Sequence, residues 1–254
     1  MSYLNNKMRI EPAPTIKFKL NGVSTSNADI DKLELQACYR ALSNFRTLLN
    51  RESMLDLLSD QIEDGNRYFE SLIASSGGGL RECRTYLKVT GVTATDIKAI
   101  TSRWLLSRPI EDMAAKYVFP AHPEHYAIMH GPGSLPRNAP DCGVEMIGEH
   151  MAKVRYVDLN KGIEYMPGWM LKKRDYDYDM AETLVAKLTS GNRFFYILNE
   201  FMDTEGGCKI RLRTFFPAAA PWSLINQHAQ HLAIEFRNVL TMVDEVVQEF
   251  EDTF

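Results

Sequence analysis

Hydrophobic residues at helical spacing follow a polar start of the chain. Residues 1–28 are polar and irregular, so we expect an arm or a short edge strand there. From Asp29 to about Ala74 apolar side chains recur every three or four positions, which predicts two or three amphipathic helices. The run Ser75-Ser-Gly-Gly-Gly79 ends this pattern. We therefore predict an N-terminal arm and helical segment over residues 1–79 and a second domain over residues 80–254.

After this break the pattern changes to short extended runs. A helix is predicted to open at Thr93-Ala-Thr-Asp96, with Thr93 or Thr95 as its N-cap. The pair Gly206-Gly207 separates two apolar runs and indicates a hairpin. The predicted extended segments are 80–89, 117–119, 126–129, a strand within 144–156, 162–172, 194–201 and 208–216, followed by a final helix over 222–250.

Antiparallel strands followed by a long C-terminal helix predict an α+β fold of the helix-grip type. In this arrangement a curved antiparallel sheet wraps around one helix and leaves a cavity between them. No internal repeat is visible along the chain.

Composition narrows the class of protein. The chain has 254 residues, 45% of them hydrophobic, and a formal net charge of −4. Since no basic run exceeds Lys172-Lys173-Arg174, nucleic acid is not an expected partner. The four cysteines are scattered without a CxxC pair, which favours free thiols in a reducing compartment. The N-terminus has no apolar signal region and no stretch approaches a membrane span, so we expect a cytoplasmic protein.

All six histidines lie between His122 and His231, and one of them shares a helical frame with a carboxylate. In the predicted final helix His231 and Glu235 are one turn apart on one face. His228 falls with them on the apolar stripe of that helix, so these side chains should point inward. A buried carboxylate needs a partner or a metal. The alternatives are a metal site and a core histidine bonded to a neighbouring glutamate.

Two further groups carry ligand-type side chains. His122 and His125 flank a proline, with His130 just beyond, and a plain surface loop is the alternative there. Glu145 and Glu149 would share one face of a strand. Two histidines and two glutamates from a helix and two strands form a nitrogen and oxygen set that suits Zn²⁺ above all, with Mn²⁺ or Fe²⁺ as alternatives.

Several motifs follow one another in a set order. They are Gly91-Val-Thr-Ala-Thr-Asp96, Tyr117 eight residues before His125, Glu145-Met-Ile-Gly148, Ile210-Arg-Leu-Arg-Thr-Phe-Phe216 and His231-x-x-x-Glu235-x-x-Asn238. Over roughly residues 80–250 this order resembles the 2,4-diacetylphloroglucinol hydrolase family, which includes phloretin-hydrolase-type enzymes. The resemblance implies a helix-grip (Bet v 1-like) fold. It also implies hydrolysis of a carbon–carbon bond between an acyl group and a phenolic ring.

The resemblance further implies one zinc ion per chain, held by two histidines and two glutamates. The implied ligands are His125, Glu145, His231 and Glu235. His122 is an alternative to His125, and Glu149 is an alternative to Glu145. The implied partner is a small phenolic or polyketide substrate, cleaved in a retro-Claisen reaction. The N-terminal helices are expected to cover the pocket or to form a homodimer contact.

Other side chains are candidates for handling the substrate and protons. Tyr117 is implied to contact the substrate near the metal and could protonate the ring carbon, with a core aromatic as the alternative. Glu149 and His130 are acid–base candidates beside the metal. Arg211 and Arg213 alternate along one strand face, and they either bind phenolate oxygens or lie on a solvated face. Further candidates for the pocket are Tyr196, Tyr176 and Tyr178.

The chain departs from the family pattern in two places. Trp104 is followed by Leu-Leu-Ser-Arg108, where the family usually has a Trp-His element, and the loop from His125 to Glu145 is short. Two alternatives therefore stay open beside the hydrolase. One is a related metalloenzyme for polyketide cyclisation or isomerisation, which product analysis would distinguish. The other is a non-catalytic small-molecule carrier of the same fold, which would hold no metal.

Overall fold

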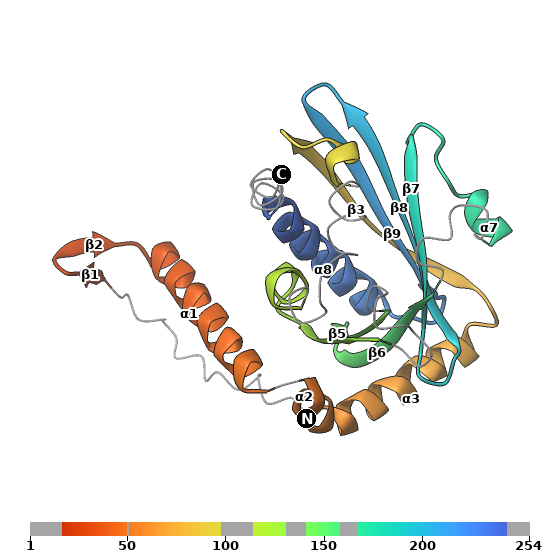
Figure 1. Cartoon of the computed structure of the whole chain (residues 1–254), viewed down its shortest axis with the longest axis horizontal. Helices are drawn as coiled ribbons and strands as arrows, with labels where there is room; N and C mark the ends of the chain where they lie inside the picture. Colours follow the sequence, from red (N-terminus) through yellow and green to blue (C-terminus); the bar gives the residue numbers. More distant parts are fainter. Residues whose placement is uncertain (1–16, 50, 98–113, 131–140, 158–166, 243–254) are drawn as a thin grey trace, which may run out of the picture. The chain divides into compact units, whose positions relative to one another are not determined.

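The structure is a computed structural model that describes residues 17–49, 51–97, 114–130, 141–157 and 167–242 (Figure 1). It divides into two compact units, Met1–Leu48 and Leu49–Phe254. The division follows the first long helix, whereas the sequence suggested a boundary at the glycine-rich break that ends at Gly79. All candidate site residues belong to the second unit.

The first unit contains a small hairpin and a helix. Strand β1 (Phe18–Leu20) pairs with β2 (Val23–Thr25), so the expected short strand is present. Asn21 and Gly22 join them with φ values of 49° and 85°. Such positive values are what a two-residue type I′ turn requires, and Asn-Gly is the pair that best adopts them. Helix α1 (Asn27–Leu48) follows, and none of its residues is buried.

The second unit opens with the other predicted helices. These are α2 (Arg51–Leu57) and α3 (Ser59–Ser75). Phe69 and Leu72 on α3 are buried in the same core cluster as residues of the main sheet. Because α3 contributes to this core, it is part of the domain that carries the candidate site.

Seven antiparallel strands form the main sheet, in the order β3-β9-β8-β7-β6-β5-β4. Helix α8 (Trp222–Thr241) lies against one face, and Figure 1 shows the sheet curving around it. Cys83 and Thr85 of β3 donate hydrogen bonds to the carbonyls of Ile225 and Ala229 of α8, at 3.4 and 3.0 Å. This architecture confirms the predicted α+β helix-grip fold. The strands are β3 (Leu80–Thr90), β4 (His125–Met129), β5 (Cys142–Ile147), β6 (His150–Val157), β7 (Met180–Lys187), β8 (Arg193–Thr204) and β9 (Gly207–Pro217).

Several local predictions are wrong. Residues 117–119, predicted to be extended, lie in a π-helical turn, η2 (Ala114–Val118), and a short helix, α6 (Phe119–Ala121). The described end of the predicted strand 162–172 is a helix, α7 (Gly168–Leu171). Strand β7 was not predicted.

Other local predictions are confirmed or refined. Thr93 is the cap of the helix that opens at residue 94, because its Oγ1 accepts a hydrogen bond from Asp96 N at 3.1 Å. The segment 144–156 holds two strands, since Gly148, at φ 64°, turns the chain between β5 and β6. The predicted element around Trp104 and the end of the final helix lie outside the described residues. No helix in the described part of the chain has the length and apolar character needed to cross a bilayer.

Candidate metal centre

Two candidate ligands face each other across neighbouring strands. His125 opens β4, and the antiparallel register places it directly opposite Glu145 of β5. Cross-strand neighbours of this kind have Cβ atoms about 4.5–5.5 Å apart. Both residues are buried, with 9% and 8% of their surface exposed. The sheet register therefore brings together an imidazole and a carboxylate that are distant in sequence.

Helix α8 brings two more candidates to the same place. His231 is buried, and the side chain of Glu235, one turn later, is 29% exposed. His228 is buried one turn earlier. The prediction that these histidines point inward is confirmed, and Glu235 lies at the edge of the group.

The distances between the ligand atoms suit a small cation. His231 Nε2 lies 3.2 Å from His125 Nε2, 3.5 Å from Glu145 Oε2 and 3.9 Å from Glu235 Oε2. His125 Nε2 lies 3.8 Å from the same Glu145 oxygen. An ion held tetrahedrally at about 2.0–2.1 Å would place its ligands about 3.3–3.4 Å apart. His125, His231 and Glu145 therefore lie at distances close to those around one ion, and Glu235 is next to His231.

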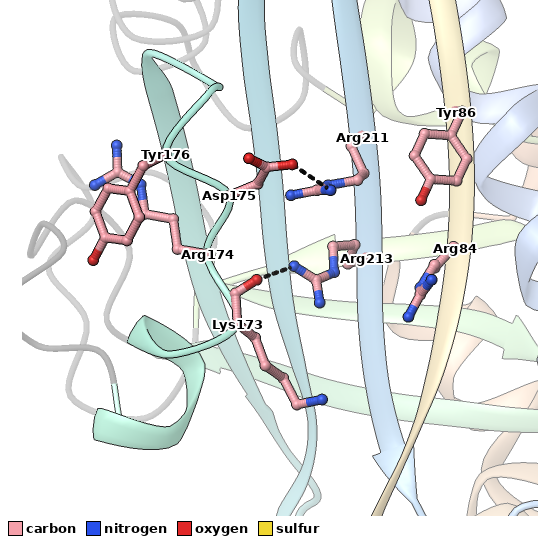
Figure 2. A pocket seen from close by; sticks show the side chains of 8 residues that line it. All are labelled: Arg84, Tyr86, Lys173, Arg174, Asp175, Tyr176, Arg211 and Arg213. Carbon is pink, nitrogen blue, oxygen red and sulfur yellow. Dashed lines mark hydrogen bonds and ion pairs between the residues drawn. The ribbon is translucent and has the colours of Figure 1, made fainter.

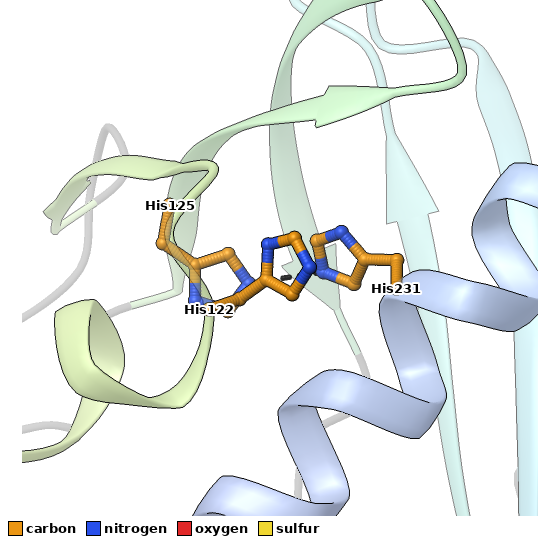
Figure 3. Close-up of side chains that lie close together, drawn as sticks. All are labelled: His122, His125 and His231. Atoms are coloured by element: carbon orange, nitrogen blue, oxygen red, sulfur yellow. Dashed lines mark hydrogen bonds between the residues drawn. The ribbon is translucent and has the colours of Figure 1, made fainter. Parts of the chain in front are cut away.

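His122 joins this group as a third histidine. Its ring stacks on that of His231 with centroids 3.7 Å apart, and the two planes are inclined by 21°. Ligand atoms of His122, His125 and His231 all lie within 4.8 Å of one another (Figure 3). The sequence treated His122 as an alternative to His125, whereas the structure places both beside His231. These three buried histidines lie close enough to bind a metal ion.

Hydrogen bonds orient two of the candidate ligands. His125 Nδ1 lies 2.7 Å from the carbonyl oxygen of Val118, which can only accept. The proton of His125 is therefore on Nδ1, and its Nε2 lone pair points to the other ligand atoms. The Tyr156 hydroxyl donates to Glu145 Oε1 at 2.7 Å and leaves Oε2 toward the histidines. Support of this kind is typical of metal-binding histidines and carboxylates.

Burial shifts the protonation equilibria of several side chains in the group. Burial, with help from His122 and His125, lowers the pKa of His231 to about 2, so this imidazole is neutral at neutral pH. Neutral imidazole is the form that binds metals. Burial raises the pKa of the Glu235 carboxyl, an effect that His125 opposes and Glu145 reinforces. Burial and the Glu145 carboxylate raise the pKa of Tyr156 well above its ordinary value, so its hydroxyl keeps the proton that it donates.

Three other predicted site residues lie at different distances from this group. Tyr117 is half-buried in η2, one residue before the carbonyl that orients His125. His130 follows the last residue of β4, roughly 16 Å along the strand from His125 at 3.3 Å per residue. Glu149 is exposed in the turn between β5 and β6. Of the two glutamates offered as alternatives, the structure brings Glu145 to the histidines.

The predicted substrate-binding residues of the sheet are not brought to the histidines. Arg211 and Arg213 do share one face, as predicted. Thr214, next to Arg213, points the other way and lies 3.3 Å from Nε2 of His228 on α8. Because successive strand residues alternate faces, both arginines lie on the face away from α8. Tyr196, on the neighbouring strand, lies there too, since it is paired with Phe215 of that same face.

The sequence missed Tyr156 and the carbonyl of Val118. No sequence motif marks either group. Tyr156 reaches Glu145 only because β5 and β6 pair in the observed register. Val118 contributes a backbone atom, so its side chain gives no indication.

Comparisons with known proteins give little information on the function of this group of residues. No protein-family model and no curated protein matches the chain. Among solved structures, Ara h 8.0201 is similar at a TM-score of 0.41 and 12% identity, over 66% of this chain and 99% of the other. An uncharacterized protein from Rhizobium leguminosarum is similar at 0.33 and 14%, over 66% of this chain and 97% of the other.

Proposed function

We propose that this chain is a zinc-dependent hydrolase that cleaves the carbon–carbon bond between an acyl group and a phenolic ring. The main support is the buried approach of His125 Nε2, His231 Nε2 and Glu145 Oε2, at 3.2 to 3.8 Å from one another. Two imidazoles and a carboxylate suit Zn²⁺. The motifs over residues 80–250, which resemble those of the diacetylphloroglucinol hydrolases, support the substrate class.

In this proposal His125, His231 and Glu145 hold the ion, and Glu235 is the fourth ligand. Glu235 is less buried than the other three and sits at the edge of the group. That position suits a ligand that can yield space to a substrate. His122, which stacks on His231, is a further nearby imidazole.

The reaction divides the elements of water between two products. Hydroxide adds to the acyl carbon, and the bond from that carbon to the ring breaks. The electron pair stays with the ring, where the keto form of an electron-rich phenol accepts it, as in a retro-Claisen reaction. A proton must then reach the ring carbon, so the products are a carboxylic acid and the deacylated phenol. Bound zinc supplies Lewis acidity for the carbonyl oxygen and makes hydroxide available near neutral pH.

The chain's own residues position these groups. The Val118 carbonyl fixes the tautomer of His125, and the Tyr156 hydroxyl fixes one oxygen of Glu145. Tyr117 lies beside the first of these contacts and is the proposed donor of the ring proton. A positioned proton donor typically contributes about 10²–10⁴-fold to the rate.

The proposal is tested by elemental analysis of protein that is expressed with zinc in the medium and purified without chelators. The wild type should hold about one zinc per chain, and His231→Ala should lose it because two of the closest ligand distances involve that ring. His150→Ala is the matched control. His150 is a half-buried histidine of β6 whose ring stacks on Tyr68, with centroids 3.7 Å apart.

Zinc retained by His150→Ala and lost by His231→Ala would justify assays with acylated phenols, followed by analysis of the acid and phenol products. Absence of stoichiometric metal in the wild type would contradict the proposed zinc-dependent hydrolase activity. Bound zinc without release of an acid from any acylphenol would contradict the proposed reaction while leaving the metal site in place.

A further inference from the structure

A cavity lies on the face of the sheet that points away from α8 and the histidines. Its volume is about 350 Å³, within the usual range for small-molecule sites. Strands β3 and β9 form its floor, and the segment after α7 forms one wall (Figure 2). Five cationic side chains line it, namely Arg84, Lys173, Arg174, Arg211 and Arg213.

The wall of this cavity is fastened to the sheet. Arg213 donates to the carbonyl of Lys173 at 2.6 Å, and the backbone N–H of Asp175 donates to Glu200 at 2.7 Å. Arg213 is buried, and Glu200 is fully buried beneath the cavity. The segment 173–175 is therefore held in a defined position over β8 and β9, which makes the cavity a preformed feature.

Carboxylates neutralise only part of the positive charge. Glu82 pairs with Arg84 and Arg213, at 2.8 and 2.5 Å. Glu200 and Asp175 pair with Arg211 at 2.7 and 2.9 Å. Counting the described side chains that line the cavity and their ion-pair partners, five cations and three carboxylates leave a net charge of about +2. This local excess stands out in a chain whose formal net charge is −4.

The excess belongs to two side chains in the wall. Within the described residues neither Lys173 nor Arg174 has a carboxylate partner. Lys173 Nζ lies 5.6 Å from the Phe215 ring centroid, and Arg174 lies over the Tyr176 ring at 5.0 Å. Arg174 Nε is buried and has no hydrogen-bond partner among the described residues. Both cations are therefore available to an anion that enters the cavity.

We propose that this cavity binds a small ligand that carries a dianionic phosphate group. A phosphate monoester has a charge of about −1.5 to −2 at pH 7, which matches the local excess. Guanidinium and ammonium groups are the side chains that hold phosphate oxygens. Tyr86 and Tyr176, both largely exposed at the cavity, offer ring faces to the organic part.

Isothermal titration calorimetry of phenyl phosphate binding to the full chain at low salt tests this proposal. Saturable binding of one phenyl phosphate per chain is expected. Lys173→Ala and Arg174→Gln should each weaken it by about 5-fold or more, since each removes one unpaired charge. The matched control is Lys172→Ala, because Lys172 precedes Lys173 directly and does not line the cavity. That variant should change the affinity by less than about 2-fold.

Two further binding measurements distinguish this cavity from other binding sites for phenyl phosphate. Inorganic phosphate alone shows whether the oxyanion suffices, and weaker binding than phenyl phosphate would assign a role to the ring. Phenyl phosphate should bind His231→Ala as tightly as the wild type, because the histidine group lies on the opposite face. Equal weakening by Lys172→Ala and Lys173→Ala, loss of binding in His231→Ala, or no saturation below about 10 mM would each overturn the proposal.

Discussion

Glu145 and Glu149 are four residues apart, yet the turn between β5 and β6 gives them different surroundings. Glu145 is buried beside two histidines and receives a hydrogen bond from Tyr156, whereas Glu149 is exposed. Glu145→Gln keeps the size of the side chain and removes the charged oxygen that faces His231. We expect zinc affinity to fall by more than about 100-fold, since loss of an outer partner alone typically costs 10–100-fold.

The matched variant is Glu149→Gln, which should bind zinc as the wild type does. Titration of both apo-proteins against a chromogenic zinc chelator measures the two affinities. Equal retention of zinc in both variants would mean that neither glutamate is a ligand.

Glu82 offers a test of pH dependence on the other face of the sheet. Burial tends to raise its pKa, but hydrogen bonds from Arg84 and Arg213 outweigh burial and lower the pKa to about 2. In the unfolded chain the pKa returns to about 4.3. The ion pairs therefore stabilise the fold fully above about pH 4.3 and lose this contribution as the pH falls toward 2.

Glu82→Gln should accordingly lower the free energy of unfolding by about 1–3 kcal/mol at pH 7, since the buried Arg213 loses its closest carboxylate partner. The difference from the wild type should shrink steadily below about pH 4.3. Urea unfolding at several pH values measures it. Glu205→Gln, in the exposed turn before β9, is the control and should change stability by less than about 0.5 kcal/mol. A difference that does not depend on pH would show that the ion pairs are not its cause.

Single residues were predictable where their spacing is local. The four-residue interval of His231 and Glu235 fixes a shared helix face, and the structure confirms that His231 points inward. Convergence of His122 with His231 depends on how the segment before β4 packs against α8, which no local pattern encodes. Alternation placed Arg211 and Arg213 on one face correctly. The residues that alternate with them, such as Ile210 and Leu212, are buried in the core, which leaves the arginines on the opposite face.

At the scale of elements, the close approach of α3 to β6 depends on Gly65. A Cβ at this position would overlap the backbone carbonyl of Met151. Gly65→Ala should gain about 1 kcal/mol in helix propensity. Because the clash is with backbone, we expect it to outweigh that gain and to give a net loss of about 1–3 kcal/mol in the free energy of unfolding.

Gly168→Ala serves as the control, since nothing lies within 4 Å of a Cβ at that position in α7. Urea unfolding of both variants gives the comparison. A Gly65→Ala protein as stable as the wild type would show that α3 can move away from the sheet without cost.

Elements with consistent local signals were predicted well. The runs that became β8 and β9 are rich in aromatic and β-branched residues on either side of a glycine-rich turn. Strand β7 was missed because MAETLVAK contains several helix-favouring residues, and pairing with β8 decides its conformation. Tyr117 and Val118 favour a strand by residue type. They are helical in the fold, where the carbonyl of Val118 meets His125.

At the scale of the whole molecule, the candidate metal centre connects parts of the fold that are distant in sequence. His125 and Glu145 lie in β4 and β5, at one edge of the seven-stranded sheet, and His231 lies on the C-terminal helix. Asn238 of α8 also donates to the carbonyl of Ala121 at 3.0 Å, just before β4. An ion held by these residues would fix the sheet edge to the helix that the sheet surrounds.

Metal removal should therefore lower the thermal stability of the second unit. If zinc binds the folded chain and not the unfolded chain, free zinc at 100 times its dissociation constant adds about 2.7 kcal/mol. For a domain of this size that corresponds to a rise in Tm of about 5–10 °C. Thermal unfolding with a chelator and with excess zinc measures the shift, which should disappear in His231→Ala and persist in His150→Ala. An equal shift in His231→Ala would place the stabilising ion elsewhere, and no shift in the wild type would contradict binding at this centre.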